Sequence, residues 1–231
     1  MIDRRRIGAR EWALAAVGVA AAAAFLVGIA ADSARLRLAA KPIPVVCLAV
    51  WATTAGRGAA ARPLCFGLLL SALGDGLLEA SPDLFLAGLM AFLGAHVAYT
   101  VGFVLETRRP SLLRGVPFAL WAALGYLAMR AGLAHLHVPV VVYLTAICVM
   151  MWRAAATVGH EGPAQLHEWL ALAGAVFFGM SDTLIGLDHF RAPLAGARVP
   201  IILLYWLGQL GIAASTGLPP VGYAAATKGD R

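Results

Sequence analysis

The 231-residue chain is 61% hydrophobic and only 13% charged, and its mean hydropathy is +0.81. Soluble domains carry roughly 25% charged residues, so this composition excludes a protein that faces water on all sides. The formal net charge of +6 comes from basic residues scattered over short loops, and this pattern argues against a nucleic-acid partner.

Apolar runs bounded by charges, proline and glycine predict a bundle of about eight transmembrane helices. Each run approaches the ~20 residues that cross a ~30 Å hydrocarbon core, so we expect one all-α membrane domain over residues 1–231. The first apolar run follows a basic segment, as the apolar region of a signal peptide does. This run is too long to be such a region, so we interpret it as the first span. The predicted spans are 12–31, 37–55, 63–79, 84–105, 114–132, 138–154, 167–187 and 198–217.

The connections and their charges predict the topology. Links such as 32–36 and 80–83 are too short to hold structure, so sequential helices should pack as antiparallel neighbours. Twelve Lys and Arg residues fall on the side of the termini and five on the other. By the positive-inside rule, we expect both termini in the cytoplasm and a location in a bacterial inner membrane.

The third and seventh predicted spans share a short local similarity. Residues 73–78 read LGDGLL and residues 180–185 read MSDTLI, each with an aspartate near the outer end of its span. Spans four apart run in the same direction, so the match is consistent with a duplicated four-helix unit. Chance similarity between leucine-rich helices is the alternative.

Few ionisable side chains lie within the spans. Each costs at least ~2.5–3.5 kcal/mol to insert, so each is expected to face the bundle interior. They are Lys41, Asp75, Glu79, His96 and Asp182, with Asp188 at the outer edge of the seventh span.

These groups are predicted to share the outer half of the membrane. Lys41, Asp75 and Asp182 should lie about one turn below the outer surface, and His96 near the middle. Spacings of three or four residues place several polar pairs on common helix faces; the further members are Tyr99, Tyr143, Tyr205 and Gln209. The pattern predicts one internal polar pocket, and the alternative is an interhelical hydrogen-bond network that only holds the bundle together.

Several known site types do not match the sequence. An intramembrane aspartyl protease of the G-x-G-D type needs a glycine where Ala72 stands. The remaining histidines lie in loops or at span ends on both sides, and the three cysteines lie within apolar runs, so neither set has the clustering of a zinc site. We therefore expect no metal and no cofactor.

Taken together, these residues resemble the YhhN-type lysoplasmalogenase family of eight-span membrane proteins, over roughly residues 12–217. Two departures are Glu79, where an apolar residue is commoner, and the sequence Asp188-His189-Phe190 after the seventh span. The matching motifs are Lys41-Pro42, Gly74-Asp75-x-Leu-Leu, Phe85-x-x-Gly88-Leu-x-x-Phe92-x-x-x-His96-x-x-Tyr99, Ser181-Asp182-x-Leu-Ile and Tyr205-x-x-x-Gln209.

The resemblance implies hydrolysis of the vinyl ether bond of a lysophospholipid substrate within the membrane lipids. This chemistry needs a carboxylic acid that protonates carbon and a second group that stabilises the cation and activates water. Asp75 and Asp182 are the candidates, because burial and a nearby like charge both disfavour ionisation of a carboxyl group. Which one is the acid is left open. Lys41 is a candidate for the lipid phosphate, and His96 and the three tyrosines are candidates for orienting water.

Two other function classes stay open at this point. A proton-coupled transporter or lipid flippase would also bury Asp, Lys and His, but its usual broken helices are not expected here. The prolines fall in the first turns of their predicted spans, where proline is tolerated. A non-catalytic membrane scaffold is the third class. The sequence does not indicate the oligomeric state.

Overall fold

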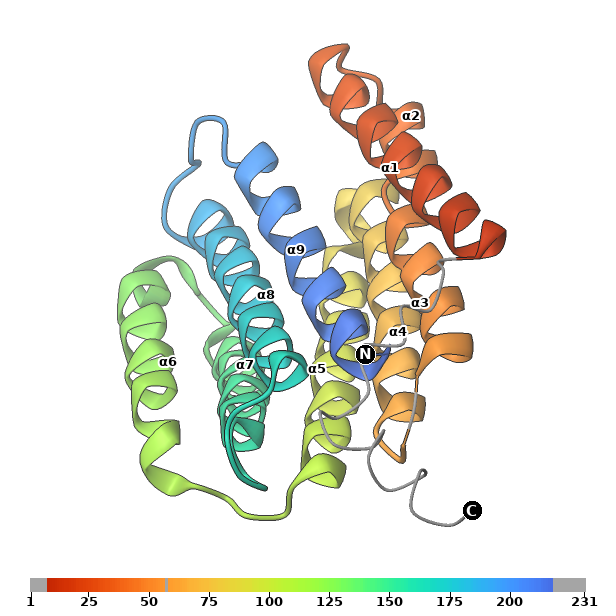
Figure 1. Cartoon of the computed structure of the whole chain (residues 1–231). Coiled ribbons are helices and arrows are strands. Elements are labelled where there is room, and N and C mark those ends of the chain that lie inside the picture. Colours follow the sequence, from red (N-terminus) through yellow and green to blue (C-terminus); the bar gives the residue numbers. More distant parts are fainter. Residues whose placement is uncertain (1–7, 57, 218–231) are drawn as a thin grey trace.

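The computed structural model describes residues 8–56 and 58–217, and over these residues it is a bundle of helices (Figure 1). Eight helical spans in this part are long and apolar enough to cross a membrane, which confirms the predicted all-α fold. The α-helices are α1 (Ala9–Ala30), α2 (Ala34–Ala40), α3 (Ile43–Ala55), α4 (Ala61–Ala80), α5 (Phe85–Glu106), α6 (Val116–Met129), α7 (His137–Thr157), α8 (Leu166–Phe190) and α9 (Arg198–Gly217).

Short 3-10 helices extend two of the spans. Pro82–Leu84 leads into α5, Leu112–Gly115 leads into α6, and Arg130–Gly132 follows α6. Most predicted boundaries fall within three residues of the observed ones, because a change from apolar to polar or turn-forming residues ends both the apolar run and the helix.

The second span differs from its prediction. It begins at Ala34, three residues earlier than predicted, because the Ser33 hydroxyl accepts a hydrogen bond from the Leu36 amide at 3.4 Å and caps α2. It is then interrupted at Lys41-Pro42, before α3. Pro42 has no N–H to donate, although both residues keep helical dihedral angles. The expectation that Pro42 lies in the first turn of its span is thus wrong, and Lys41 lies about two turns into the span.

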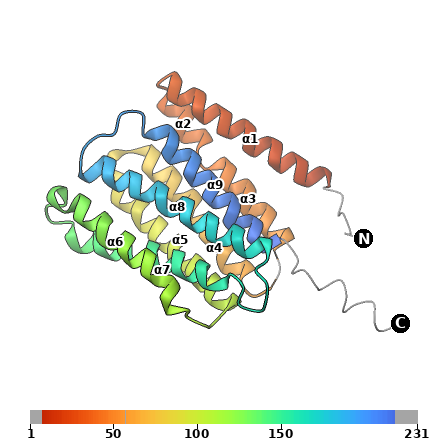
Figure 2. The ribbon, with the colours of Figure 1, turned by 60° about the vertical axis from the view of Figure 1, so that its left-hand side comes forward.

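The helices pack in a closed arrangement with two helices at its margins (Figures 1 and 2). α3, α4, α5, α7, α8 and α9 follow one another as contacting neighbours, and α3 closes the arrangement by packing on α9. α1 packs on α2 and α3 at one edge, while α6 packs on α7 and α8 at the opposite edge. The short links after α1 and α4 join antiparallel neighbours, as predicted.

The most intimate helix pairs are α4 with α5 and α8 with α9. The proposed duplication would relate the first of these pairs to the second. The duplication itself stays a prediction. The orientation also stays a prediction, because several of the basic residues that it counts lie outside the described residues. Those residues are Arg4, Arg5, Arg6, Arg57, Lys228 and Arg231.

Glycines allow the backbones of α8 and α9 to touch. A Cβ atom on Gly208 would lie 2.8 Å from the Phe178 amide nitrogen and 2.9 Å from the Gly174 carbonyl oxygen. Such small-residue contacts let membrane helices approach closely. Because the obstructing atoms are backbone atoms, they cannot move aside without separating the two helices.

We therefore expect Gly208→Ala to destabilise the bundle by about 1–3 kcal/mol, as overpacking does, with a lower thermal unfolding temperature in detergent. Gly76→Ala in α4 is the matched control, because its Cβ would meet nothing within 4 Å, and alanine favours helix. Equal unfolding temperatures for the two variants would show that the α8–α9 contact is not tight.

Candidate active site

Asp182 lies where three helices meet. Its carboxylate is on α8, and its Oδ2 accepts a hydrogen bond from the Tyr143 hydroxyl on α7 at 2.7 Å. Nε2 of His96, on α5, lies 3.3 Å from the same oxygen. That approach lacks hydrogen-bond geometry, and neither ring nitrogen of His96 has a hydrogen-bond partner among the described residues. Asp182 is 7% exposed and His96 is fully buried.

Asp75 forms a second buried pair on the neighbouring helices. Its Oδ2 accepts a hydrogen bond of 2.6 Å from the Tyr205 hydroxyl, which joins α4 to α9, and the residue is 1% exposed. The Phe178 ring separates the two clusters, since it stacks on His96 at 4.7 Å and meets Tyr205 edge-on at 5.5 Å. Phe178 thus contacts a neighbour of each aspartate.

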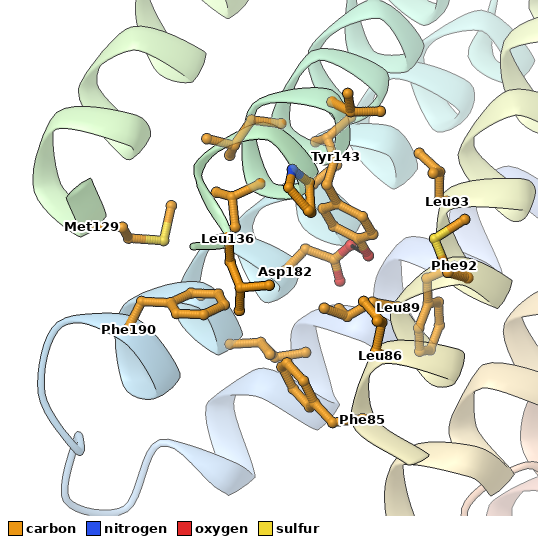
Figure 3. A pocket seen from close by; sticks show the side chains of 18 of the residues that line it. Phe85, Leu86, Leu89, Phe92, Leu93, Met129, Leu136, Tyr143, Asp182 and Phe190 are labelled. Carbon is orange, nitrogen blue, oxygen red and sulfur yellow. Dashed lines mark hydrogen bonds between the residues drawn. The ribbon is translucent and has the colours of Figure 1, made fainter. Parts of the chain in front are cut away.

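An apolar cavity of about 310 Å³ lies in front of Asp182. Figure 3 shows the Asp182 carboxyl group and the Tyr143 hydroxyl together at its centre, surrounded by leucine and phenylalanine side chains. Asp182 and Tyr143 supply the polar side-chain groups of this lining, and Asp75 is not part of it. The other lining residues are Leu78, Phe85, Leu86, Leu89, Met90, Phe92, Leu93, Met129, Leu136, Val138, Pro139, Val140, Val142, Leu144, Ile147, Ile185, Gly186 and Phe190.

The apolar cavity reaches the outer surface of the bundle. Leu86 and Met90 on α5, and Val138 and Val142 on α7, line the cavity and are also at least half exposed. These residues lie on helices that span the membrane, so their exposed surfaces face lipid. An acyl or alkenyl chain in the bilayer can therefore enter the cavity between α5 and α7.

A second cavity of about 320 Å³ adjoins the first and has a charged lining. Both cavities share Leu78, Phe85 and Ile185. The charged residues that line the second cavity are Lys41, Glu79, Asp188 and Arg198. The predicted site residues Lys41, Glu79 and Asp188 therefore come together here, whereas Asp182 lies on the apolar side of the shared residues.

Glu79 is held by two cations. Its Oε1 accepts a hydrogen bond from Nε of Arg37 at 2.7 Å, and its Oε2 lies 3.5 Å from Nζ of Lys41. Arg37 also pairs with Asp32 at 3.1 Å. Sequence reasoning missed Arg37, which it counted only as a loop charge. The signal was its spacing of four residues from Lys41, which places both on one helix face.

Tyr99 and Gln209 belong to a different group. The Tyr99 hydroxyl donates to Gln209 Oε1 at 2.6 Å and lies 3.3 Å from Oγ of Ser71. All three residues are fully buried, and they line neither of the two cavities. This contact joins α4, α5 and α9, and it favours the interhelical network for these two predicted residues.

Candidate metal ligands are dispersed. Across residues 8–56 and 58–217, no three His, Cys, Asp or Glu side chains gather into a group that fits a metal ion. In the same part of the chain, Cys47, Cys65 and Cys148 are free thiols. The residues around Asp182 are thus a carboxyl group, a hydroxyl group and an imidazole, which can exchange protons with a bound molecule.

In the described part of the chain, eight helices long enough to cross a membrane surround a buried carboxyl group beside an apolar cavity, which is the architecture of a polytopic membrane protein. The model of the YhhN family matches residues 36–216, and the chain belongs to this family. The family that the motifs predicted is therefore confirmed.

Named relatives come from animals and bacteria. The chain is 37% identical over 186 residues to lysoplasmalogenase TMEM86B of Sus scrofa, a match that covers 78% of this chain and 75% of the relative. It is 32% identical over 186 residues to lysoplasmalogenase TMEM86A of Bos taurus, covering 76% and 75%. It is 32% identical over 190 residues to a lysoplasmalogenase of Mycobacterium bovis, covering 78% and 70%. No solved structure matches the chain significantly.

Proposed function

We propose that this chain is a lysoplasmalogenase that hydrolyses the vinyl ether bond of lysoplasmalogens to a fatty aldehyde and a glycerophospho-base. Relatives with this name cover about three quarters of the chain. The observation that carries the proposal is the Asp182 carboxyl group, which opens into an apolar cavity that reaches lipid. Such a cavity suits a single hydrocarbon chain.

The reaction requires an acid beside the first two carbons of that chain. A proton added to the second carbon forms a C–H bond and leaves an oxocarbenium ion at the first carbon. Water then adds to the first carbon and gives a hemiacetal. The hemiacetal collapses, so the water oxygen becomes the aldehyde oxygen and the glycerol oxygen leaves as a hydroxyl group.

Asp182 is the general acid in this proposal. Its Oδ2 is occupied by the Tyr143 hydroxyl, and its Oδ1 has no hydrogen-bond partner among the described residues, so Oδ1 can carry the proton toward the cavity. Once it has given up this proton, the Asp182 carboxylate stabilises the cation and accepts a proton from the attacking water. Between the two aspartates that the sequence left open, we therefore assign the acid role to Asp182.

Asp75 acts at a distance in this mechanism. It lines neither of the two cavities, so it does not reach the substrate directly. Tyr205 fixes its position, and in its ionised form Asp75 would stabilise the oxocarbenium ion through space. His96 packs beside Asp182 and supports its orientation.

A proton-coupled transporter is the alternative, because it would also bury groups such as Asp182 and His96 within its spans. Turnover by purified protein in detergent separates the two functions, because transport has no readout without two compartments. The direct test incubates the protein with lysoplasmenylethanolamine and traps the aldehyde. The saturated 1-O-alkyl analogue, which has no double bond to protonate, should yield none.

Heavy water makes the same test specific for the mechanism. Protonation of the second carbon in D2O should place one deuterium at carbon 2 of the aldehyde. Unlabelled aldehyde incubated in D2O corrects for exchange after the reaction. The absence of aldehyde would contradict the function, and aldehyde without deuterium would contradict carbon protonation.

The apolar cavity should set the chain length of the substrate. Leu89 is half-buried in the cavity wall on α5 (Figure 3), and Leu89→Trp should fill part of the space. We expect kcat/KM to fall at least about fivefold more for a long alkenyl chain than for a short one. Leu105→Trp on the lipid-facing side of α5 is the control, and an equal chain-length profile for both variants would contradict the assignment.

A further inference from the structure

The second cavity carries two charges that the protein leaves unpaired. Both Glu79 oxygens are engaged, one by Arg37 and one by Lys41. Asp188 and Arg198 form no ion pair among the described residues, either with each other or with another side chain. An uncompensated cation and an uncompensated anion on one cavity wall match a ligand that carries both charges.

We propose that this cavity is the headgroup subsite, in which Arg198, Lys41 and Asp188 recognise the headgroup of the lysophospholipid. The phosphate lies at Arg198 and Lys41, and the amine of the headgroup lies at Asp188. This inference rests on the proposed function, because it assigns the second end of the same substrate.

The position of Arg198 favours the binding of an anion beside it. It is the first residue of α9, and the macrodipole of a helix disfavours a cation at its N-terminus. A bound phosphate reverses that effect, because it pairs with the guanidinium group and also meets the first amides of the helix. Lys41 lines the same cavity. Its ammonium group lies 3.5 Å from one Glu79 oxygen, and an ammonium group has three donors, so it can also bind a phosphate.

Asp188 is held with one oxygen available. Its Oδ1 accepts a hydrogen bond from the Leu194 amide at 2.6 Å, which fixes the carboxylate at the end of α8. Its Oδ2 has no hydrogen-bond partner among the described residues and is left for a cationic group. An ammonium or quaternary ammonium group is the complement of a carboxylate in such a position.

The order of groups in the substrate matches the order of the two cavities. A lysoplasmalogen has an amine, a phosphate, a glycerol and then the vinyl ether at the start of its chain. The cavities meet at Leu78, Phe85 and Ile185, with Asp182 on the apolar side. A headgroup in the charged cavity therefore places the glycerol at the junction and the vinyl ether beside Asp182.

The phosphate part is tested by comparing two substrates in each variant. 1-Alkenyl-lysophosphatidylethanolamine carries the headgroup, and 1-alkenylglycerol lacks it. Arg198→Gln should lower the ratio of kcat/KM for the first substrate to that for the second at least about fivefold, mainly through KM. Arg198→Lys should recover part of the ratio. Arg191→Gln, an exposed arginine that lines neither cavity, should keep the wild-type ratio. An unchanged ratio in Arg198→Gln would overturn the proposal.

The amine part is tested with Asp188→Asn, which keeps an oxygen for the Leu194 amide. The wild-type protein should prefer a phosphoethanolamine headgroup to a phosphoglycerol headgroup on the same chain, and the variant should lose that preference. Equal headgroup preference in the two proteins would overturn this part.

A binding measurement separates this inference from the proposed function. If the wild-type protein cleaves neither alkenyl substrate, the function fails, and thermal stabilisation by non-cleavable 1-O-alkyl lipids then decides the inference. 1-O-alkyl-lysophosphatidylethanolamine should raise the unfolding temperature more than 1-O-alkylglycerol, and Arg198→Gln should remove the difference. Equal shifts by both lipids in the wild-type protein would overturn it.

Discussion

Replacement of Asp182 by asparagine is expected to lower kcat at least about 10²-fold, which is the scale of losing a general acid. Asparagine keeps the shape of the side chain and an oxygen that accepts from the Tyr143 hydroxyl, but its amide cannot protonate carbon. The measurement is aldehyde release from lysoplasmenylethanolamine at saturating substrate. KM should change little, because the substrate is held mainly through its chain and its headgroup.

Two controls accompany this variant. Asp83→Asn changes an exposed aspartate that lines neither cavity, and it should keep wild-type turnover. The thermal unfolding of Asp182→Asn should stay close to that of the wild-type protein, which shows that lost activity is not lost fold. Near wild-type turnover in a folded Asp182→Asn protein would refute the acid role.

Asp75→Asn should reduce kcat less than Asp182→Asn does. A through-space electrostatic contribution of ~1–2 kcal/mol corresponds to roughly 5- to 30-fold in rate. Asparagine still accepts from the Tyr205 hydroxyl, so the variant removes the charge and leaves the contact. Steady-state kcat and KM on the same substrate measure the effect, which should appear in kcat alone.

The two variants together discriminate between mechanisms. If Asp75→Asn were the more severe of the two, the roles of the aspartates would be reversed. If it had no effect on kcat, Asp75 would belong to the packing of α4 against α9 and not to the reaction. Tyr205→Phe removes the hydroxyl group that holds Asp75. This variant should also lower kcat, but by a smaller factor than Asp75→Asn does.

The fold was predictable because lipid imposes a simple constraint on sequence. Each span must satisfy its backbone hydrogen bonds within a helix and face apolar surroundings, so length and composition locate the spans within a few residues. The position of Pro42 about two turns into its span was not predictable in the same way. It depends on where α2 starts, and the Ser33 cap moves that start toward the N-terminus.

The site was predictable in part. Depth and helix spacing predicted that Asp75, Asp182 and His96 share one region of the bundle, and His96 does lie 3.3 Å from Asp182. Asp75 instead pairs with Tyr205, behind the Phe178 ring. Sequence alone does not give the rotation of one helix against another, so it did not show that Tyr143 pairs with Asp182 while Tyr205 pairs with Asp75. For the same reason it treated the aspartates as equals, although Asp182 alone of the two reaches the cavity.

The opening between α5 and α7 should make the reaction rate depend on the concentration of substrate within the membrane. Because Leu86 and Val142 face lipid and also line the cavity, substrate is collected from the plane of the bilayer. Saturation should then follow the mole fraction of lysolipid in the membrane or micelle, so adding inert detergent at constant substrate should slow the reaction. The two products also belong to different phases, since the aldehyde dissolves in lipid and the glycerophospho-base in water.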